Sequence, residues 1–430
     1  MTNASLINTI ADYLAAHCKR PGEERTGVEI EHFVTRAGNR KTVTYFEPDG
    51  VGNLLETLGR DNSNGWEVRY ESRYPLSLSR TAARGEQTIT LEPGAQLEYS
   101  TSPCRSISEI ETEYGAFLDE VTPVLAAREQ TLETWGYQPV DTARKIPFIP
   151  KKKYHYMAKY FLDKGKLAHN MMKGTAATQV AIDYFDENDF AAKLRLATAL
   201  SPVFAVLFSN CPLFEGKPYP GWAVRLTVWD NCDSHRCGLL PGVFDSSFGF
   251  KRFASWFSGL KPIVFYEDGK YRYTGEQDLR SLFSRYGHTE KSIGEALRMV
   301  FTDVRAKQFL ELRMTDALPP KRMLQFAALV HELFYNRDLF GETAEYFRRF
   351  NESDLLTARS EAPVRGPEAP MGDETIGSVT EALLRKTERY CSAENMPYLQ
   401  PLFTGTTCAA ASKAGSFHNP KPTQERCGAC

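Results

Sequence analysis

The segment Gly27–Phe33, GVEIEHF, places two glutamates at alternate positions of an apolar run. Successive side chains of a β-strand point to opposite faces, so Glu29 and Glu31 share one face while Val28 and Ile30 share the other. Two carboxylates this close repel each other, and a divalent cation between them would stabilise the pair. The solvated face of an antiparallel strand explains the same alternation, so this segment alone leaves both interpretations open.

The bulk composition limits the class of protein. The 430 residues have room for one large domain or two ordinary ones, with a substantial core. Lys and Arg total 52 against 54 Asp and Glu, a formal net charge of −2, which gives no electrostatic footprint for nucleic acid or an anionic membrane. We therefore expect small-molecule partners, no nucleic acid and no membrane.

The N-terminal segment has the periodicity of a docked amphipathic helix. Apolar residues recur there at helical spacing, namely Leu6, Ile7, Ile10, Tyr13 and Leu14. Asp12 interrupts them, so the segment lacks the unbroken apolar core of a signal peptide. The nine cysteines are odd in number and scattered, which without a secretory signal indicates reduced thiols. We expect a cytoplasmic protein.

One segment, Leu196–Phe214, is uncharged for nineteen residues and has the length of a membrane span. Pro202, Ser209 and Pro212 interrupt it, and the chain has no second candidate span. We expect a buried core helix that ends near Ser209.

Strand and helix patterns alternate irregularly along the chain. Strands are expected at 26–36, TGVEIEHFVTR, and at 87–101, QTITLEPGAQLEYST, where Pro93-Gly94 marks a turn. A long helical pattern, 107–136, is interrupted at Pro123. Strands followed by helices without regular alternation predict an α+β fold with a mostly antiparallel sheet.

The composition changes after Phe350. Residues 1–350 are expected to form one folded domain of enzyme size. Residues 351–375 are expected to be a linker, because EAPVRGPEAPMGD consists largely of Pro, Gly and charged residues with almost no apolar periodicity. Residues 376–430 are expected to hold a short helix and a flexible tail with four cysteines, Cys391, Cys408, Cys427 and Cys430. The terminal CGAC is compatible with incidental thiols, a redox role or part of a zinc site.

Common nucleotide-binding motifs are absent from the sequence. It has no G-x-x-x-x-G-K-[ST] loop, no G-x-G-x-x-G turn and no H-E-x-x-H helix. Carboxylates that hold Mg²⁺ against phosphates are another way to bind a nucleotide. Acidic candidates lie in ITLEPGAQLEYS, where Gln96 and Glu98 share a face beyond the turn and Glu92 precedes it. A hairpin edge is the alternative explanation for these residues.

Charged residues also alternate in later segments. Glu311 and Arg313 share the polar face of a strand in FLELRMTD, where a structural ion pair is the alternative to a site. Arg225 is expected in a strand, GWAVRLTVWD, and a planar guanidinium suits a substrate carboxylate or phosphate. The alternative for Arg225 is pairing with Asp230 or Asp233. Two further basic candidates are Arg236 and Lys153.

Seven segments, in their order, resemble the plant and proteobacterial branch of the glutamate-cysteine ligase family. They are GVEIEHF, ITLEPGAQLEYS, KKKYHYM, MMKGTAATQVAIDY, ALSPVFAVLFSN, AVRLTVWDNCDSHRCGLLPGVFDSSFGF and VRAKQFLELRMTDA. The resemblance covers residues 25 to 340 and implies a glutamine-synthetase-like fold with a curved antiparallel sheet. It also implies that ATP, with two or three Mg²⁺ ions, phosphorylates the γ-carboxylate of glutamate and that the amine of cysteine attacks the γ-glutamyl phosphate.

The resemblance assigns roles to individual positions. It implies metal binding by Glu29, Glu31, Glu92, Glu98 and Glu311. It implies catalytic roles for Arg313, beside the transferred phosphoryl group, and for Arg225. Substrate or nucleotide binding is implied for Gln96, Lys153, Tyr154, Gln179, Asp183, Arg225 and Arg236.

Three positions depart from the family pattern. The family segment TCTVQVNLDF is TAATQVAIDY here, so Ala176 replaces a cysteine and Ala181 an asparagine, while Lys153 replaces an arginine. Loss of an amide that could bind the amino acid raises the alternative of a ligase with a different acceptor amine. A non-catalytic ligand-binding relative is a further alternative.

Overall fold

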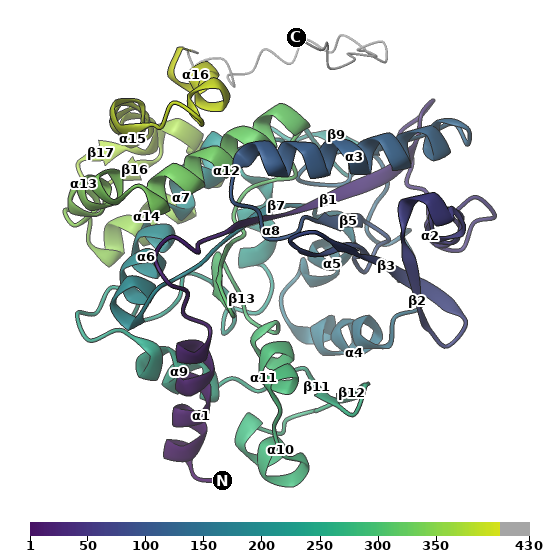
Figure 1. Cartoon of the computed structure of the whole chain (residues 1–430), viewed down its shortest axis with the longest axis horizontal. Coiled ribbons are helices and arrows are strands. Elements are labelled where there is room, and N and C mark those ends of the chain that lie inside the picture. The colour runs from purple at the N-terminus through teal and green to yellow at the C-terminus, as the bar shows by residue number, and fades with distance from the viewer. Residues whose placement is uncertain (405–430) are drawn as a thin grey trace.

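The computed structural model describes residues 1–404, and the largest element in them is a nine-stranded sheet that is antiparallel at every pairing. The spatial order is β14-β15-β7-β1-β5-β4-β3-β2, and β6 also pairs with β1. The strands are β1 (Thr26–Arg36), β2 (Glu67–Glu71), β3 (Tyr74–Ala82), β4 (Gly85–Leu91), β5 (Leu97–Ser100), β6 (Gln130–Glu133), β7 (Thr178–Ile182), β14 (Val304–Ala306) and β15 (Leu310–Leu312). The expected α+β fold, a mostly antiparallel sheet flanked by helices, is confirmed (Figure 1).

Helices and short strand pairs surround this sheet. The helices are α1 (Asn3–Ala16), α2 (Val51–Arg60), α3 (Ile107–Ala126), α4 (Lys152–Tyr160), α5 (Ala168–Gly174), α6 (Glu187–Ala199), α7 (Ser201–Leu207), α8 (Val224–Asp230), α9 (Phe250–Ser258), α10 (Leu279–Tyr286), α11 (Glu290–Leu297), α12 (Pro320–Tyr335), α13 (Arg337–Phe347), α14 (Glu352–Arg365), α15 (Ile376–Tyr390) and α16 (Met396–Thr404). Short 3₁₀ helices are Asn62–Asn64, Phe161–Asp163 and Gly366–Glu368. The short strand pairs are β8 (Leu213–Phe214) with β9 (Lys217–Pro218), β10 (Cys237–Gly238) with β13 (Phe301–Thr302), β11 (Val264–Glu267) with β12 (Lys270–Tyr273), and β16 (Pro370–Met371) with β17 (Glu374–Thr375).

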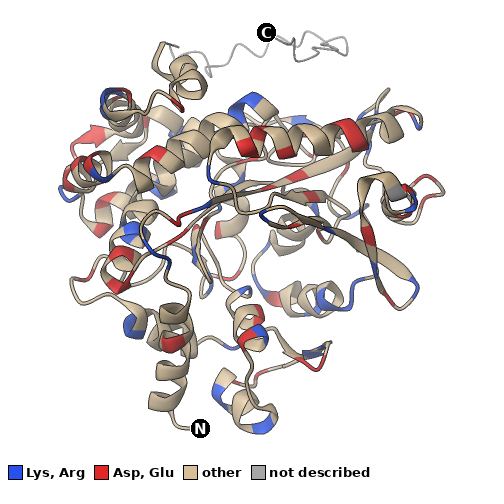
Figure 2. Ribbon diagram, viewed as in Figure 1, with Lys and Arg blue, Asp and Glu red and all other residues tan. Residues whose placement is uncertain are grey.

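The pleat of β1 separates an apolar face from a polar face. Val28 and Ile30 are buried, and helices α3 and α12 lie across their face of the sheet (Figure 1). Tyr99 of β5 points to the same face and stacks on Phe117 of α3, with ring centroids 4.4 Å apart. Burial of this face fixes the register, because a slip by one residue would turn the glutamates of β1 into the core. Figure 2 shows the acidic residues on β1 and along α3.

Several predicted elements are confirmed, and one predicted helix interruption is wrong. The N-terminal amphipathic helix is α1, and Pro93-Gly94 separates β4 from β5 as expected. The expected interruption at Pro123 does not occur, because α3 continues through it to Ala126. Val121 and Leu125 are buried on either side of the proline, and their packing offsets the missing backbone hydrogen bond.

The predicted linker at 351–375 is wrong. Most of this segment is α14, which begins with a capping box at Asn351 and buries Leu355 and Ala358. Arg359 of α14 forms an ion pair with Asp303, at 2.7 Å between Nε and Oδ2. These contacts join α14 to the remainder of the chain, so the segment is part of the folded body. The expected helix at 376–390 is α15.

The uncharged segment around Pro202 forms two helices. Within residues 1–404 we find no single helix with the length and apolar character needed to cross a bilayer, although α6 and α7 together meet that criterion with a 48° bend between them. Helix α7 is buried along its whole length and ends at Leu207, close to the expected end at Ser209.

The cysteines of the described residues are free thiols, namely Cys18, Cys104, Cys211, Cys232, Cys237 and Cys391. Burial raises the pKa of Cys104 to about 11 and that of Cys391 to about 12, which makes both weak nucleophiles at neutral pH. Cys408, Cys427 and Cys430 lie outside the described residues, so the interpretations of CGAC stay predictions.

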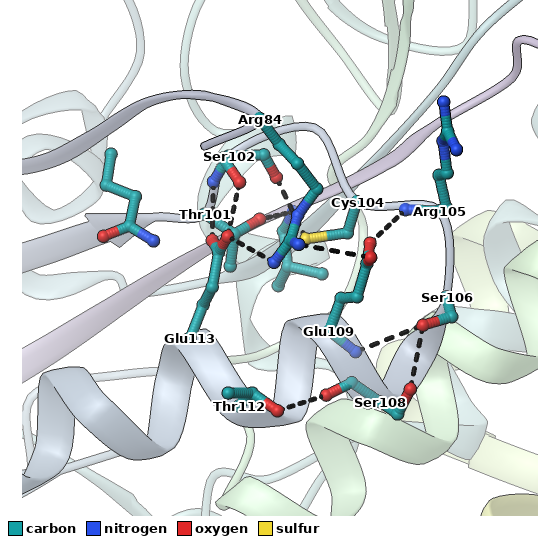
Figure 3. Close-up of polar contacts among 12 residues, drawn as sticks. Arg84, Thr101, Ser102, Cys104, Arg105, Ser106, Ser108, Glu109, Thr112 and Glu113 are labelled. Atoms are coloured by element: carbon teal, nitrogen blue, oxygen red, sulfur yellow. Dashed lines mark hydrogen bonds and ion pairs between the residues drawn. The ribbon is translucent and has the colours of Figure 1, made fainter. Parts of the chain in front are cut away.

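A polar network holds the connection between β5 and α3 (Figure 3). Glu113 of α3 is buried and accepts hydrogen bonds from the backbone N–H of Ser102, at 2.8 Å, and from its hydroxyl, at 2.5 Å. Arg84 donates to Glu113 at 3.1 Å and pairs with Glu109 at 3.2 Å. The network fixes β5 against α3 and thereby positions the polar face of the sheet.

We predict that Glu113→Ala lowers the free energy of unfolding by about 1–3 kcal/mol, because the buried N–H of Ser102 loses its acceptor. Urea denaturation monitored by circular dichroism measures the change. Asp119→Ala, at an exposed position of the same helix, is the control and should change stability by less than about 0.5 kcal/mol. Equal effects of the two substitutions would contradict a structural role for the network.

Candidate active site

The strand register brings the acidic candidates to one face of the sheet. Glu31 of β1 lies opposite Glu98 of β5, and Glu29 lies opposite Gln179 of β7. Directly opposed residues of antiparallel strands point to the same face, so all four side chains share it. Thr90 of β4 lies opposite Glu98 and donates a hydrogen bond to its Oε1 at 2.7 Å. The register confirms that Glu29 and Glu31 share one face, as alternation predicts, and it places Glu98 on the same face.

Glu92 joins this group from the turn after β4. Tyr154 of α4 donates to Glu92 Oε1 at 2.9 Å, so α4 lies over the polar face at this point. Burial, followed by the negative charge of Glu92, raises the pKa of Tyr154 well above its usual range. Tyr154 is therefore a neutral hydrogen-bond donor at physiological pH.

The carboxylates on this face perturb one another. Burial and then the charge of Glu92 raise the pKa of Glu31 to about 8, although Arg225 and Arg313 oppose the change. Burial and then Glu29, Glu92 and Glu31 raise the pKa of Glu98 well above its usual range. Burial and like charge therefore favour the protonated forms of Glu31 and Glu98 when no cation is bound.

The donor chemistry of this acidic half, Glu29, Glu31, Glu92 and Glu98, fits a hard divalent cation. Mg²⁺ prefers carboxylate oxygens and retains several waters, so it does not require a closed protein cage. In residues 1–404 no group of three or more His, Cys, Asp or Glu side chains is arranged closely enough to hold a metal ion directly. The residues present therefore fit Mg²⁺ by their oxygen type rather than by a preformed ligand cage.

The neighbouring strands form a basic half of the same face. Glu311 of β15 is 1% exposed and is bound by three cations, Arg305 at 2.6 Å, Lys307 at 2.5 Å and Arg313 at 2.7 Å. Burial would raise the pKa of Glu311, but these cations hold it well below its usual range. Both of its oxygens are occupied, so these contacts favour the ion-pair alternative, and metal binding by Glu311 stays a prediction.

Gln179 connects the acidic and basic halves. Its amide nitrogen donates to Glu31 Oε1 at 2.9 Å, and its amide oxygen accepts a hydrogen bond from Arg313. The backbone N–H of Ala177 donates to the other oxygen of Glu31 at 3.0 Å. Gln179 thus orients a carboxylate on one side and a guanidinium on the other.

Arg225 lies in a helix, and the predicted strand is wrong. Residues Val224–Asp230 form α8, because this short segment of mixed polarity fits either periodicity and tertiary packing decided between them. Arg225 is buried, and its Nη1 donates to the carbonyls of Arg313 and Thr315, both at 2.7 Å. Its Nε is buried without a partner in the described residues. Its predicted partners, Asp230 and Asp233, pair with other arginines.

Two other candidates, Arg236 and Asp183, already have structural partners. Arg236 donates to Asp233 at 2.7 Å and also bonds Tyr160 and two backbone carbonyls. Asp183 accepts from the backbone N–H of Arg25 at 2.8 Å, beyond the end of β7. The predicted ligand contacts of both stay predictions.

The amide of Gln96 holds the turn before β5, because it accepts from Gly94 N–H at 2.8 Å and donates to Thr175 O at 2.8 Å. Lys153 of α4 pairs with Glu295 at 3.2 Å, and burial lowers the pKa of Lys153 to about 8 despite this partner. Gln96 is therefore buried in the turn, whereas Lys153 joins α4 to α11 next to the polar face.

Sequence reasoning missed two of the cations that bind Glu311. Arg305 lies opposite Glu311 in the β14–β15 hairpin, and Lys307 lies in its turn. Their alternation in VRAKQFLELR was the available signal, since a hairpin there would place Arg305, Lys307, Glu311 and Arg313 on one face.

The chain is similar in sequence to a known protein family and to several of its members. The model of Glutamate-cysteine ligase family 2 matches residues 25–365. The chain is 29% identical over 382 residues to a chloroplastic glutamate-cysteine ligase of Brassica juncea, covering 87% of this chain and 72% of that protein. It is 28% identical over 394 residues to chloroplastic glutamate-cysteine ligase B of Oryza sativa subsp. japonica, covering 90% of this chain and 77% of that protein.

Two solved structures are also similar at 11% identity. The ligase PafA, in complex with the ubiquitin-like protein Pup, gives a TM-score of 0.37 and covers 90% of this chain and 65% of its own. A glutamine synthase homolog gives a TM-score of 0.34, and the match covers 94% of this chain and 72% of the homolog.

We predict that the contribution of Glu31 to stability without metal falls as pH rises from about 5 to 8. The folded state keeps a proton on Glu31 that the unfolded state loses near pH 4.5, so this contribution is complete below pH 4.5 and lost towards pH 8. Urea unfolding in EDTA, repeated across this pH range, gives the slope of stability against pH for the wild type and for Glu31→Gln, and the wild-type slope should be the more negative of the two.

Glu86→Gln, at an exposed position of β4, is the control and should retain the wild-type slope. Added Mg²⁺ should raise the stability of the wild type at pH 8 more than that of Glu31→Gln. An unchanged slope in Glu31→Gln would contradict the raised pKa.

Proposed function

This chain belongs to glutamate-cysteine ligase family 2, and from that membership we propose that it joins the γ-carboxylate of L-glutamate to the amine of L-cysteine with ATP as the energy source. The observation that carries the proposal is the division of one sheet face into an acidic half on β1 and β5 and a basic half on β14 and β15. Phosphoryl transfer requires positioning and charge neutralisation, and these two halves match Mg²⁺ and phosphate respectively.

The acidic half would hold two or three Mg²⁺ ions through Glu29, Glu31, Glu92 and Glu98. When bound, the ions would neutralise the phosphate oxygens of ATP and favour transfer of the γ-phosphoryl group. Glu31 is kept in orientation by Gln179 and by the backbone of Ala177. Glu31 is thus held in one orientation, and the other carboxylates would close around the ions when these bind.

The basic half would bind the phosphoryl group in transfer. An oxygen of the glutamate γ-carboxylate attacks the γ-phosphorus of ATP, which gives γ-glutamyl phosphate and ADP. Arg313 sits where its guanidinium faces both Gln179 and Glu311, and from there it can neutralise the charge on the equatorial oxygens. Arg225 supports this arrangement by holding the backbone carbonyl of Arg313, and it lines a small cavity together with Arg313, Asp303 and Trp229.

Helix α4 would protect the intermediate from water. Tyr154 fixes it to Glu92 and Lys153 fixes it to Glu295 of α11, so α4 spans part of the polar face. The amine of cysteine attacks the acyl carbon, the phosphate leaves with the electrons of the C–O bond, and the amine loses a proton. Exclusion of water prevents hydrolysis from competing with this attack.

One observation favours a second candidate function with a different acceptor amine. Ala181 lies on β7 opposite both Glu311 and Gly27, on the polar face of the sheet. A methyl group at this central position offers no hydrogen bond to an amino-acid substrate, whereas the amide of the family pattern would. The rest of the phosphoryl-transfer face is independent of this position.

We expect the purified protein with Mg-ATP and glutamate to release ADP when cysteine is added, with γ-glutamylcysteine as the product. Coupled ADP detection and mass spectrometry of the product make the measurement, and a panel of other amines tests the second candidate. Turnover with another amine in preference to cysteine would replace the acceptor, and absence of turnover with every amine would overturn the proposal.

We predict that Glu29→Gln lowers kcat by about 10²–10³-fold, since loss of a charge that positions Mg²⁺ removes several kcal/mol of transition-state stabilisation. The unfolding midpoint should stay close to that of the wild type. Glu86→Gln makes the same chemical change at an exposed position of β4 and should leave kcat unchanged. A wild-type rate in Glu29→Gln would remove this residue from the site.

A further inference from the structure

A buried arginine of α14, in the segment expected to be a linker, reaches towards the candidate active site. Arg359 is 6% exposed and binds both oxygens of Asp303, with Nε 2.7 Å from Oδ2 and Nη2 3.0 Å from Oδ1. Its Nη1 donates to Oδ1 of Asp230, the last residue of α8, at 2.5 Å. All three nitrogens of the guanidinium are therefore engaged, and its orientation is fixed.

Asp303 belongs to the wall of the small cavity beside Arg313. It lies between β13 and β14, is 7% exposed and lines this cavity together with Arg225 and Arg313. Its backbone carbonyl accepts the N–H of Arg313 at 2.9 Å, and its own N–H donates to the carbonyl of Gly238 at 2.9 Å. A displacement of Asp303 would therefore move the backbone of Arg313.

The charge of Asp303 opposes the role proposed for Arg313. A carboxylate without a countercharge in this wall would counteract a guanidinium that neutralises a phosphoryl group. Burial would raise the pKa of Asp303, but the charge and hydrogen bonds of Arg359, with the hydroxyl of Ser201 at 2.5 Å, hold it below its ordinary value. Asp303 is thus ionised at neutral pH, and Arg359 supplies its countercharge.

Arg225 is a second cation whose charge acts on Asp303. Its Nη1 holds the backbone carbonyls of Arg313 and Thr315, both at 2.7 Å. If Arg359 were replaced by a neutral residue, the unpaired carboxylate of Asp303 would attract Arg225 away from these carbonyls, because a buried charge without a partner is strongly unfavourable. Arg359 therefore leaves Arg225 free to hold the backbone of Arg313.

We propose that Arg359 is a positioning residue for phosphoryl transfer, which neutralises Asp303 and thereby keeps Arg313 in place. The inference rests on the proposed function, in which Arg313 neutralises the phosphoryl group in transfer. Arg359 acts through Asp303 and contacts no substrate itself. Its bond to Asp230 serves to orient its guanidinium. Helix α14 thus contributes to the reaction as well as to the fold.

A double-mutant cycle tests whether Arg359 acts through Asp303. Arg359→Gln removes the countercharge, Asp303→Asn removes the charge that it neutralises, and the double variant removes both. Arg365→Gln is the control, since it makes the same chemical change at an exposed position in the last turn of α14. Steady-state kinetics with Mg-ATP, glutamate and cysteine give kcat and KM, and circular dichroism gives the folded fraction by which each kcat is divided.

We expect Arg359→Gln to lower kcat by about 10–10²-fold, because a displaced Arg313 stabilises the transition state less. The KM for ATP should change by less than about threefold, since the lost interaction is made mainly in the transition state. Arg365→Gln should leave both constants unchanged. In the Asp303→Asn background, Arg359→Gln should lower kcat by less than about threefold, because no charge remains there to be neutralised.

A residue that only stabilises the fold would have the same effect in both backgrounds. A larger drop than threefold in the Asp303→Asn background, or an unchanged kcat of Arg359→Gln, would therefore overturn the role of Arg359. If Arg359→Gln does not fold by itself, the comparison in the Asp303→Asn background decides, because the double variant leaves no unpaired carboxylate at position 303. A wild-type protein without turnover with any amine would instead overturn the proposed function, so the two failures are distinguishable.

Discussion

The structure depends on the pleat of β1 and on the antiparallel pairing of this strand with β5 and β7. One face of these strands is buried under α3 and α12, and that burial fixes which side chains form the other face. Glu29, Glu31 and Glu98 are polar-face residues because Val28, Ile30 and Tyr99 occupy the core. The apolar packing therefore supplies the free energy that holds several like charges together.

The charge pattern on the polar face follows from strand order. Strand β7 separates the acidic strands β1 and β5 from the basic hairpin β14–β15, and Gln179 of β7 bonds to both Glu31 and Arg313. Glu311 counters part of the positive charge, as one carboxylate among three cations. Without it, the buried Arg305 and Lys307 would have no carboxylate partner in the described residues, and the basic half could not keep its shape before a phosphate arrives.

Sequence reasoning found the acidic half and was less successful with the cations. Alternation identified β1 with its bounds, and the Pro93-Gly94 turn separated β4 from β5. Arg225 was expected in a strand and lies in a helix, because a segment of only seven residues, VRLTVWD, does not distinguish the two periods. The segment 351–375 was expected to be a linker, yet the ion pair of Arg359 with Asp303 includes it in the fold.

The sequence by itself determined the fold class, the two faces of β1 and the family, since local periodicity and ordered motifs need no knowledge of distant contacts. The tertiary structure alone decided which charges pair. Lys153 of α4 pairs with Glu295 of α11, and Arg359 of α14 pairs with Asp303. Such pairings depend on register and on packing between segments up to more than a hundred residues apart, which local pattern does not encode.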